Sequence, residues 1–188
     1  MTTFFTADSH FQHGNIIRYC SRPFASIKEM DDALFRNWTA VVQPDDTVYH
    51  LGDVAFGDAE RALPRLRALP GKKYLVPGNH DMPGTLAILS EVFKILPALT
   101  EISVPVTRTS KHVRLALCHY AMKVWNNSHQ GGRIMLHGHS HGRLPGSNLS
   151  LDVGVDVWSF YPASLEDILK GLETLPAFAQ PDMLREGI

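Results

Sequence analysis

Cysteine is scarce in this sequence, and long apolar runs are absent from it. Cys20 and Cys118 are the two cysteines among 188 residues. Two distant thiols cannot form the dense disulfide framework of a small secreted protein. No apolar stretch approaches the roughly 20 residues of a membrane-spanning helix, and the first residues lack a basic region followed by an apolar one. We therefore expect a cytoplasmic protein that has no membrane association.

The sequence also lacks an excess of charge of either sign. It has 18 Lys and Arg against 19 Asp and Glu, for a formal net charge of -1. This balance argues against a basic surface for long nucleic acid, although a short nucleotide can still bind at a metal site. The length fits one domain over residues 1–188. Residues 176–188 contain two prolines and little periodicity, so we expect a surface tail there.

Short apolar segments alternate with helical patterns along the chain. Strands are expected at residues 3–7, 47–50, 73–76, 94–96, 99–106, 114–118, 134–137 and 149–153. Helices are expected at residues 27–42 and 59–69, and another begins at Ser164, which opens a capping-box pattern with Asp167. Strands alternate with helices first and then follow one another, which indicates an α/β domain with more than one sheet.

Histidine is plentiful by contrast, and metal-binding residue types cluster directly after the expected strands. Seven such residues are found there: Asp8, His10, Asp53, Asn79, His119, His139 and His141. Functional residues of α/β proteins collect at the carboxyl ends of strands, so we expect the seven to meet around one centre. In an extended segment residues i and i+2 point the same way, so Asp8 with His10, and His139 with His141, can each clamp a metal.

The residue types around this centre also predict the metal and the charge of the substrate. Gly52, Gly78 and Gly138 lie beside these residues and allow close backbone approach, so bulkier residues should be disfavoured there. Oxygen and imidazole donors without thiolate favour manganese first, with iron, zinc or nickel as alternatives. Two divalent ions with Asp8, Asp53 and a bridging hydroxide leave a net charge of about +1, which suits a phosphodiester anion.

Taken together, these motifs resemble those of the calcineurin-like metallophosphoesterase superfamily. The resemblance covers residues 4–141 and rests on five motifs in sequence order: Asp8-x-His10, Gly52-Asp53, Gly78-Asn79-His80-Asp81, His119 and Gly138-His139-Ser140-His141. Residues 4–17 further resemble a group of small bacterial and phage members. The resemblance implies a four-layer α/β/β/α sandwich, in which two mixed sheets are flanked by helices.

The same resemblance implies roles for individual residues. One metal would be bound by Asp8, His10 and His141, and the other by Asn79, His119 and His139. Asp53 would bridge the two metals. His80 would donate a hydrogen bond to the phosphoryl oxygen or protonate the leaving group, with Asp81 holding its ring in the useful tautomer.

The implied function is hydrolysis of a small phosphate ester, and a phosphodiester or nucleotide is the favoured substrate. A metal-bridging hydroxide would attack phosphorus while His80 assists the leaving group. From their positions we expect seven residues to contact substrate: His13, Asn15, Arg18, Arg22, Trp125, Asn126 and His129. Arginine can grip a phosphate and Trp125 can stack on a base, but each residue can equally be an ordinary surface residue.

Two other functions stay open at this point. One is a non-catalytic scaffold on the same fold that binds protein partners, although such chains usually lose ligands or the motif histidine. The other is a phosphomonoesterase or protein phosphatase, although the large protein phosphatases have longer chains and additional substrate-binding arginines. The sequence makes no prediction of the oligomeric state.

Overall fold

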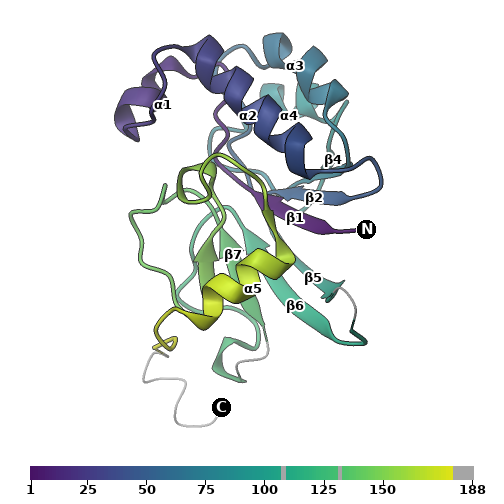
Figure 1. Ribbon diagram of the computed structural model, residues 1–188, viewed down its shortest axis with the longest axis vertical. Coiled ribbons are helices and arrows are strands. Elements are labelled where there is room, and N and C mark those ends of the chain that lie inside the picture. Colours follow the sequence, from purple (N-terminus) through teal and green to yellow (C-terminus); the bar gives the residue numbers. More distant parts are fainter. Residues whose placement is uncertain (107–108, 131–132, 180–188) are drawn as a thin grey trace.

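Two mixed β-sheets form the centre of the protein, in a computed structural model that describes residues 1–106, 109–130 and 133–179 (Figure 1). The strand order is β4-β3-β2-β1-β9 in the first sheet and β5-β6-β7-β8 in the second. The strands are β1 (Thr3–Thr6), β2 (Thr47–His50), β3 (Lys72–Leu75), β4 (Lys94–Ile95), β5 (Leu99–Pro105), β6 (His112–Cys118), β7 (Ile134–His137), β8 (Ser150–Asp152) and β9 (Ala163–Ser164). Antiparallel β9 and β5 border otherwise parallel strands.

Alternating side chains along the strands divide the core into layers. Phe4 of β1 packs among the helices, whereas Phe5 packs toward the second sheet with Leu117 of β6 and Leu136 of β7. Successive side chains of a strand point to opposite faces, so one apolar strand can serve both layers. The first sheet therefore contributes buried apolar side chains to a layer on each of its faces.

Helices cover the outer face of the first sheet. They are α1 (Gly14–Tyr19), α2 (Ile27–Val41), α3 (Ala59–Ala68) and α4 (Pro83–Leu89), and Figure 1 shows α2, α3 and α4 on the side of that sheet away from β6 and β7. Helix α2 begins after Ser26, whose side chain accepts a hydrogen bond from the Glu29 amide at 3.1 Å. It buries Met30, Leu34 and Trp38 in this layer.

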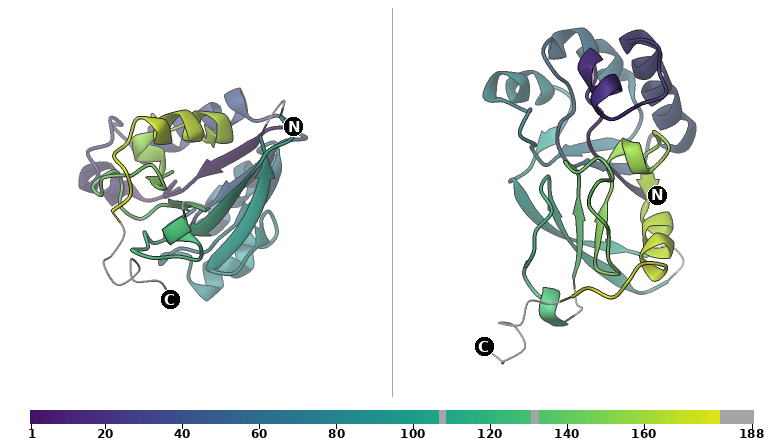
Figure 2. Two further views of the ribbon diagram at one scale, coloured as in Figure 1. Left: turned by 90° about the horizontal axis from the view of Figure 1, so that it is seen from below. Right: turned by 90° about the vertical axis from the view of Figure 1, so that its left-hand side faces the viewer.

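Helix α5 (Leu165–Glu173) packs beside the second sheet (Figure 2). The hydroxyl of Ser164 accepts a hydrogen bond from the Asp167 amide at 3.1 Å, so the expected helix start is confirmed. Leu165, Ile168 and Leu172 enter the core between the sheets. Two mixed sheets flanked by helices confirm the predicted α/β fold class.

The outer face of the second sheet carries a smaller apolar cluster. It contains Met135 of β7 and Trp125 from the segment before the 3-10 helix η1 (Ser128–Gln130). The ring of Phe178 lies 4.9 Å from that of Trp125, and the amide of Asn148 donates to the Pro176 carbonyl at 2.8 Å. The described part of the expected tail thus packs on the surface, and residues 180–188 lie outside the described residues.

The elements that the sequence did not predict are all short. Helices α1 and α4 span 6 and 7 residues, and β9 spans 2, so none is long enough for a clear apolar period. A second 3-10 helix, η2 (Val155–Val157), was also not predicted. Among the residues that the structure describes, no helix has the length and apolarity to cross a membrane.

Replacing Ile168 with Ala tests the contribution of α5 to the core. Ile168 is fully buried, so the truncation leaves a cavity and should lower the free energy of unfolding by about 2 to 5 kcal/mol. Lys170 is exposed on the same helix and serves as the control. Denaturant titration should show a change within about 0.5 kcal/mol for Lys170→Ala. Equal losses in the two variants would contradict the packing of α5 described above.

Candidate metal centre

The seven residues expected to bind metal converge where strands of both sheets end. Asp8 follows β1, Asp53 follows β2 and His119 follows β6. The loops that carry them are joined by backbone hydrogen bonds. The Asp8 amide donates to the Gly52 carbonyl at 3.0 Å, and the Gly138 amide donates to the His119 carbonyl at 3.0 Å. Segments far apart in sequence are thus held together by the backbone itself.

The potential ligands form two neighbouring groups. Asp8, His10 and His141 offer one group of atoms within 4.8 Å of one another, and Asp53, His119 and His139 offer the other. Asn79 joins the second group, because its Oδ1 lies 3.0 Å from Nε2 of His119. The two groups have the composition of two adjacent sites for divalent cations with oxygen and imidazole ligands.

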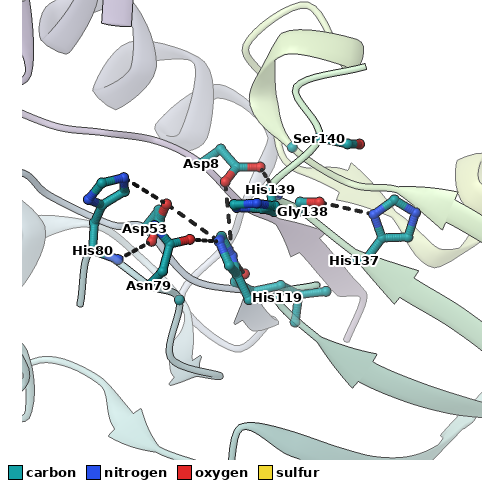
Figure 3. Close-up of polar contacts among 12 residues, drawn as sticks. Asp8, Asp53, Asn79, His80, His119, His137, Gly138, His139 and Ser140 are labelled. Carbon is teal, nitrogen blue, oxygen red and sulfur yellow. Dashed lines mark hydrogen bonds and ion pairs between the residues drawn. The ribbon is translucent and has the colours of Figure 1, made fainter. Parts of the chain in front are cut away.

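The Asp53 carboxylate lies beside Asn79, His80 and His119 (Figure 3) and also faces the first group. Its Oδ2 is 3.4 Å from Nε2 of His119 in one group and 3.6 Å from Nε2 of His10 in the other. Its Oδ1 accepts a hydrogen bond from the His80 amide at 2.8 Å. One carboxylate oxygen therefore faces both groups, as a bridging ligand must.

The hydrogen-bonding pattern of these side chains is the one expected of metal ligands. Oδ1 of Asp8 and Nε2 of His10 are buried and have no hydrogen-bond partner. An unsatisfied buried polar atom is costly, and a cation at this point would satisfy both atoms. Nδ1 of His119 donates to the Leu51 carbonyl at 2.7 Å and Nδ1 of His141 donates to Asp156 at 2.7 Å, so each leaves Nε2 for a metal.

Burial and neighbouring charges together set the pKa values of this cluster. It raises the pKa of Asp8 to about 7 and lowers the pKa of His10 to about 2. For Asp53, burial opposes ionisation, but the hydrogen bond and charge of His119 outweigh it and hold the pKa at about 2. The ionised form of Asp8 and the neutral form of His10 are the forms that bind metal, and a cation beside Asp8 would favour its ionised form.

The backbone at the ligands is strained rather than extended. The φ angles of Asp8, His10 and Asp53 are 56°, 51° and 57°, and those of His139 and His141 are 65° and 47°. Side chains other than glycine occupy this left-handed region at a cost of about 1 to 3 kcal/mol per residue. The extended geometry assumed for the two i, i+2 pairs was therefore wrong. Asp8 and His10 nevertheless face the same group, whereas His139 and His141 turn toward different groups instead of clamping one metal together.

The expected role of Asp81 was also wrong. Its carboxylate accepts hydrogen bonds from the amides of Asp53 at 2.7 Å, Gly78 at 2.9 Å and Val54 at 3.2 Å. These backbone donors lie on two loops, and among the described residues the carboxylate makes no hydrogen bond to the His80 ring. Asp81 therefore positions the Asp53 loop against the Gly78 loop, because a buried carboxylate binds the nearest unpaired amides.

A cavity of about 390 Å³ opens beside the two groups. Its polar lining consists of the half-exposed ring of His80 and four potential ligands, His10, Asp53, His139 and His141. The remaining lining residues are His13, Asn15, Ile16, Tyr19, Cys20, Phe56 and Arg143. Four of the seven potential ligands, from both groups, are thus accessible to a small molecule from this cavity.

Comparison with known proteins agrees with this arrangement. Residues 1–170 match the calcineurin-like phosphoesterase family. The chain belongs to that family. This confirms the resemblance indicated by the motifs, and it identifies a metal-dependent phosphoester hydrolase fold whose members typically use two metal ions.

Relatives of this phosphoesterase occur in archaea and phages. The chain is 31% identical over 176 residues to an uncharacterized protein of Methanocaldococcus jannaschii, covering 89% of each chain. It is 29% identical over 182 residues to the Gene 66 protein of Mycobacterium phage L5, covering 83% of this chain and 87% of that protein. A protein of unknown function from Aquifex aeolicus has a similar structure, with a TM-score of 0.67, 26% identity, and coverage of 90% of this chain and 98% of that chain.

The two arginines expected to bind substrate in this phosphoesterase lie outside the cavity. Arg22 has a fully buried side chain, and its guanidinium donates to Asp156 and to the carbonyls of Asp8 and Ser9. It has no donor directed at the cavity, so the prediction of a phosphate contact was wrong. Arg18 is exposed above the Tyr19 ring and does not line the cavity.

The prediction of a substrate contact was wrong for Trp125, and the structure places Asn126 and His129 away from the cavity. Trp125 is 6% exposed in the outer cluster of the second sheet, where its indole nitrogen donates to the Arg133 carbonyl at 2.9 Å. Asn126 is exposed and donates to Glu101 at 3.3 Å. His129 lies in η1, near the end of the second sheet where β7 begins, whereas His139 follows the end of β7 (Figure 2). His13 and Asn15 do line the cavity.

Two aspartates near the centre were missed by sequence reasoning. Asp156 accepts the hydrogen bond of His141, and Asp152 accepts from the Ser140 hydroxyl at 2.6 Å and the Gly142 amide at 2.9 Å. Asp152 lies near the carboxyl end of the last strand segment that the sequence predicted, and Asp156 follows that segment. Their position at the carboxyl end of a strand, where the ligands also lie, is the signal that could have identified them.

Adding one methyl group at Gly78 should damage the centre. A Cβ there would lie 2.3 Å from Oδ1 of Asp53 and 2.9 Å from Cε1 of His119. We expect Gly78→Ala to weaken Mn²⁺ binding by about 10- to 100-fold, the range seen when the support of ligands is disturbed. Gly84→Ala, where a Cβ meets nothing within 4 Å, is the matched control and should bind Mn²⁺ normally. Calorimetric titration of both variants checks this, and normal binding by Gly78→Ala would contradict it.

Proposed function

We propose that this protein hydrolyses a small phosphodiester, with nucleotides as the favoured class, using two divalent ions. The single observation that carries the proposal is the position of Asp53. Its carboxylate faces both ligand groups, and both groups open onto a cavity that also contains His80. Asp8, His10 and His141 would hold one ion, and Asn79, His119 and His139 the other.

The metal ions and the protein would have different roles in hydrolysis. Two divalent ions, with manganese as the expected metal, would activate a water for attack on phosphorus and neutralise charge on the phosphoryl oxygens. Asp53 holds the two sites together, and the ligand loops fix the position of the phosphate relative to them. The cavity walls orient the ester so that its leaving group faces away from the attacking water.

His80 is the residue that we assign to the leaving group. Its Nε2 lies 4.0 Å from Oδ2 of Asp53, beyond hydrogen-bond distance, and 38% of its side chain is exposed. Its backbone is fixed by the hydrogen bond to Asp53, while the ring packs edge-on against Phe56 with centroids 5.1 Å apart. A held ring with an accessible nitrogen beside the reacting phosphate is suited to donate a proton to the departing oxygen.

The cavity favours a diester over a monoester. Among its described lining residues, Arg143 is the one with a permanent positive charge, because Arg22 is turned away into the protein. A monoester dianion would need more positive charge than a diester monoanion. Ile16, Tyr19 and Phe56 offer an apolar wall for an organic group of the ester. The same shortage of arginine argues against a protein phosphatase.

The alternative of a non-catalytic scaffold receives no support from the site. Asp8 and His10 have buried ligand atoms without hydrogen-bond partners, and five potential ligands have a strained backbone. Both features lower stability, and a non-catalytic scaffold would gain no function from them. These costs are typical of functional sites. They favour an enzyme.

Removal of the His80 ring should lower turnover without removing metal. We expect His80→Ala to reduce kcat by about 100- to 10,000-fold on an ester with a poor leaving group. The defect should be smaller on a 4-nitrophenyl ester, because 4-nitrophenolate departs without needing a proton. Metal content per chain should be unchanged. His112→Ala, which removes an exposed histidine of β6, is the control. Parallel loss of metal and turnover would contradict the assignment.

A substrate screen tests the diester preference. Protein loaded separately with manganese, nickel, zinc or iron should cleave bis(4-nitrophenyl) phosphate with a higher kcat/KM than 4-nitrophenyl phosphate. Nucleotides, including cyclic forms, should be tested in the same way. A clear preference for the monoester would overturn the diester proposal, and no hydrolysis of any ester by metal-loaded protein would favour the scaffold.

A further inference from the structure

A buried ion pair lies directly behind the first ligand group. Nε and Nη2 of Arg22 donate to the two carboxylate oxygens of Asp156, each at 2.8 Å. The Arg22 side chain is fully buried, and that of Asp156 is 8% exposed. The two residues are 134 positions apart in the sequence. A bidentate arginine and carboxylate pair fixes both the distance and the orientation of its partners.

The Asp156 side of this pair holds a proposed metal ligand. Its Oδ2 also accepts a hydrogen bond from Nδ1 of His141 at 2.7 Å. This bond fixes the imidazole plane and leaves Nε2 toward Asp8 and His10. A carboxylate bonded to the far nitrogen of a ligating histidine both orients the ring and raises its basicity.

The Arg22 side of the pair holds the other two members of the same group. Nη2 donates to the Asp8 carbonyl at 2.7 Å, and Nη1 donates to the Ser9 carbonyl at 3.0 Å. These carbonyls belong to the loop in which Asp8 and His10 adopt positive φ angles. A conformation that is intrinsically unfavourable persists only when its surroundings hold it, and two buried charged hydrogen bonds do so here.

The second ligand group has no contact of this kind among the described residues. Asp53, Asn79 and His119 are supported instead by Asp81 and by the Leu51 carbonyl. The two groups are also joined to each other, because the His139 amide donates to Oδ2 of Asp8 at 2.9 Å and the His10 amide donates to the Asp53 carbonyl at 3.0 Å. The hydrogen bonds of Arg22 and Asp156 reach the first group directly and the second group through these links. A change at Arg22 or Asp156 acts on one group first.

We propose that Arg22 and Asp156 form a positioning unit that assembles the Asp8, His10 and His141 site and thereby sets the affinity of one of the two metal ions. The proposal rests on the proposed dinuclear centre. Neither residue contacts substrate, because both are turned away from the cavity and fully engaged with each other and with the ligand loops.

Metal titration of two conservative variants tests the unit. Arg22→Lys keeps the charge but loses the planar fork, and Asp156→Asn keeps the shape but loses the charge. Calorimetric titration with Mn²⁺ alone should show two ions per chain in the wild-type protein. In each variant one ion should bind about 10- to 100-fold more weakly, while the Kd of the other changes little. Arg67→Lys, which alters an exposed pair with Glu91, is the control.

A double variant separates positioning from general destabilisation. If Asp156 acts through His141, Asp156→Asn should weaken Mn²⁺ binding in the wild-type background but have no further effect in a His141→Ala background. Circular dichroism identifies any variant that fails to fold. If Arg22→Lys does not fold, Asp156→Asn tests the unit in its place. Normal binding of both ions by folded Asp156→Asn, or equal weakening of both ions, would overturn the positioning unit. A wild-type protein that binds no Mn²⁺ would overturn the dinuclear centre itself.

Discussion

The buried carboxylate of Asp53 is the interaction on which the rest of the site depends. One of its oxygens faces His10 and His119, which come from different sheets, and the other accepts the amide of His80. Its own amide is bound by Asp81. A carboxylate without these partners would be unstable at this depth. The site is therefore complete only when the loops that carry these partners are packed against one another.

The loops around Asp53 orient the potential ligands at a cost in local stability. Five of the seven potential ligands have positive φ angles, and two of their atoms are buried without a partner. The apolar layers on both sides of the first sheet offset these costs, and Phe4 and Phe5 anchor β1, the strand that precedes Asp8. The rigid strands permit strained loops at their ends, which is typical of functional sites.

Aspartates that do not face the cavity organise the loops. Asp81 binds the amides of two loops, Asp152 binds the loop at Ser140, and Asp156 binds His141 and Arg22. Each accepts hydrogen bonds from groups that would otherwise be unpaired in the interior. The buried aspartates around the centre therefore have two functions: Asp8 and Asp53 have an oxygen toward the potential metal sites, whereas Asp81, Asp152 and Asp156 hold the ligand loops.

The sequence alone determined the residue types of the centre and the main strands, because ligands must have particular donor atoms and long apolar segments follow a clear period. It also carried the order of the motifs, from which the family could be inferred. It could not assign Arg22 or Trp125 correctly, since a residue close to a motif in sequence can point into the core. Residue spacing alone paired His139 with His141, whereas the tertiary structure separates them into the two groups that the family resemblance implied, because the His139 amide is held by Asp8 and the His141 ring is held by Asp156.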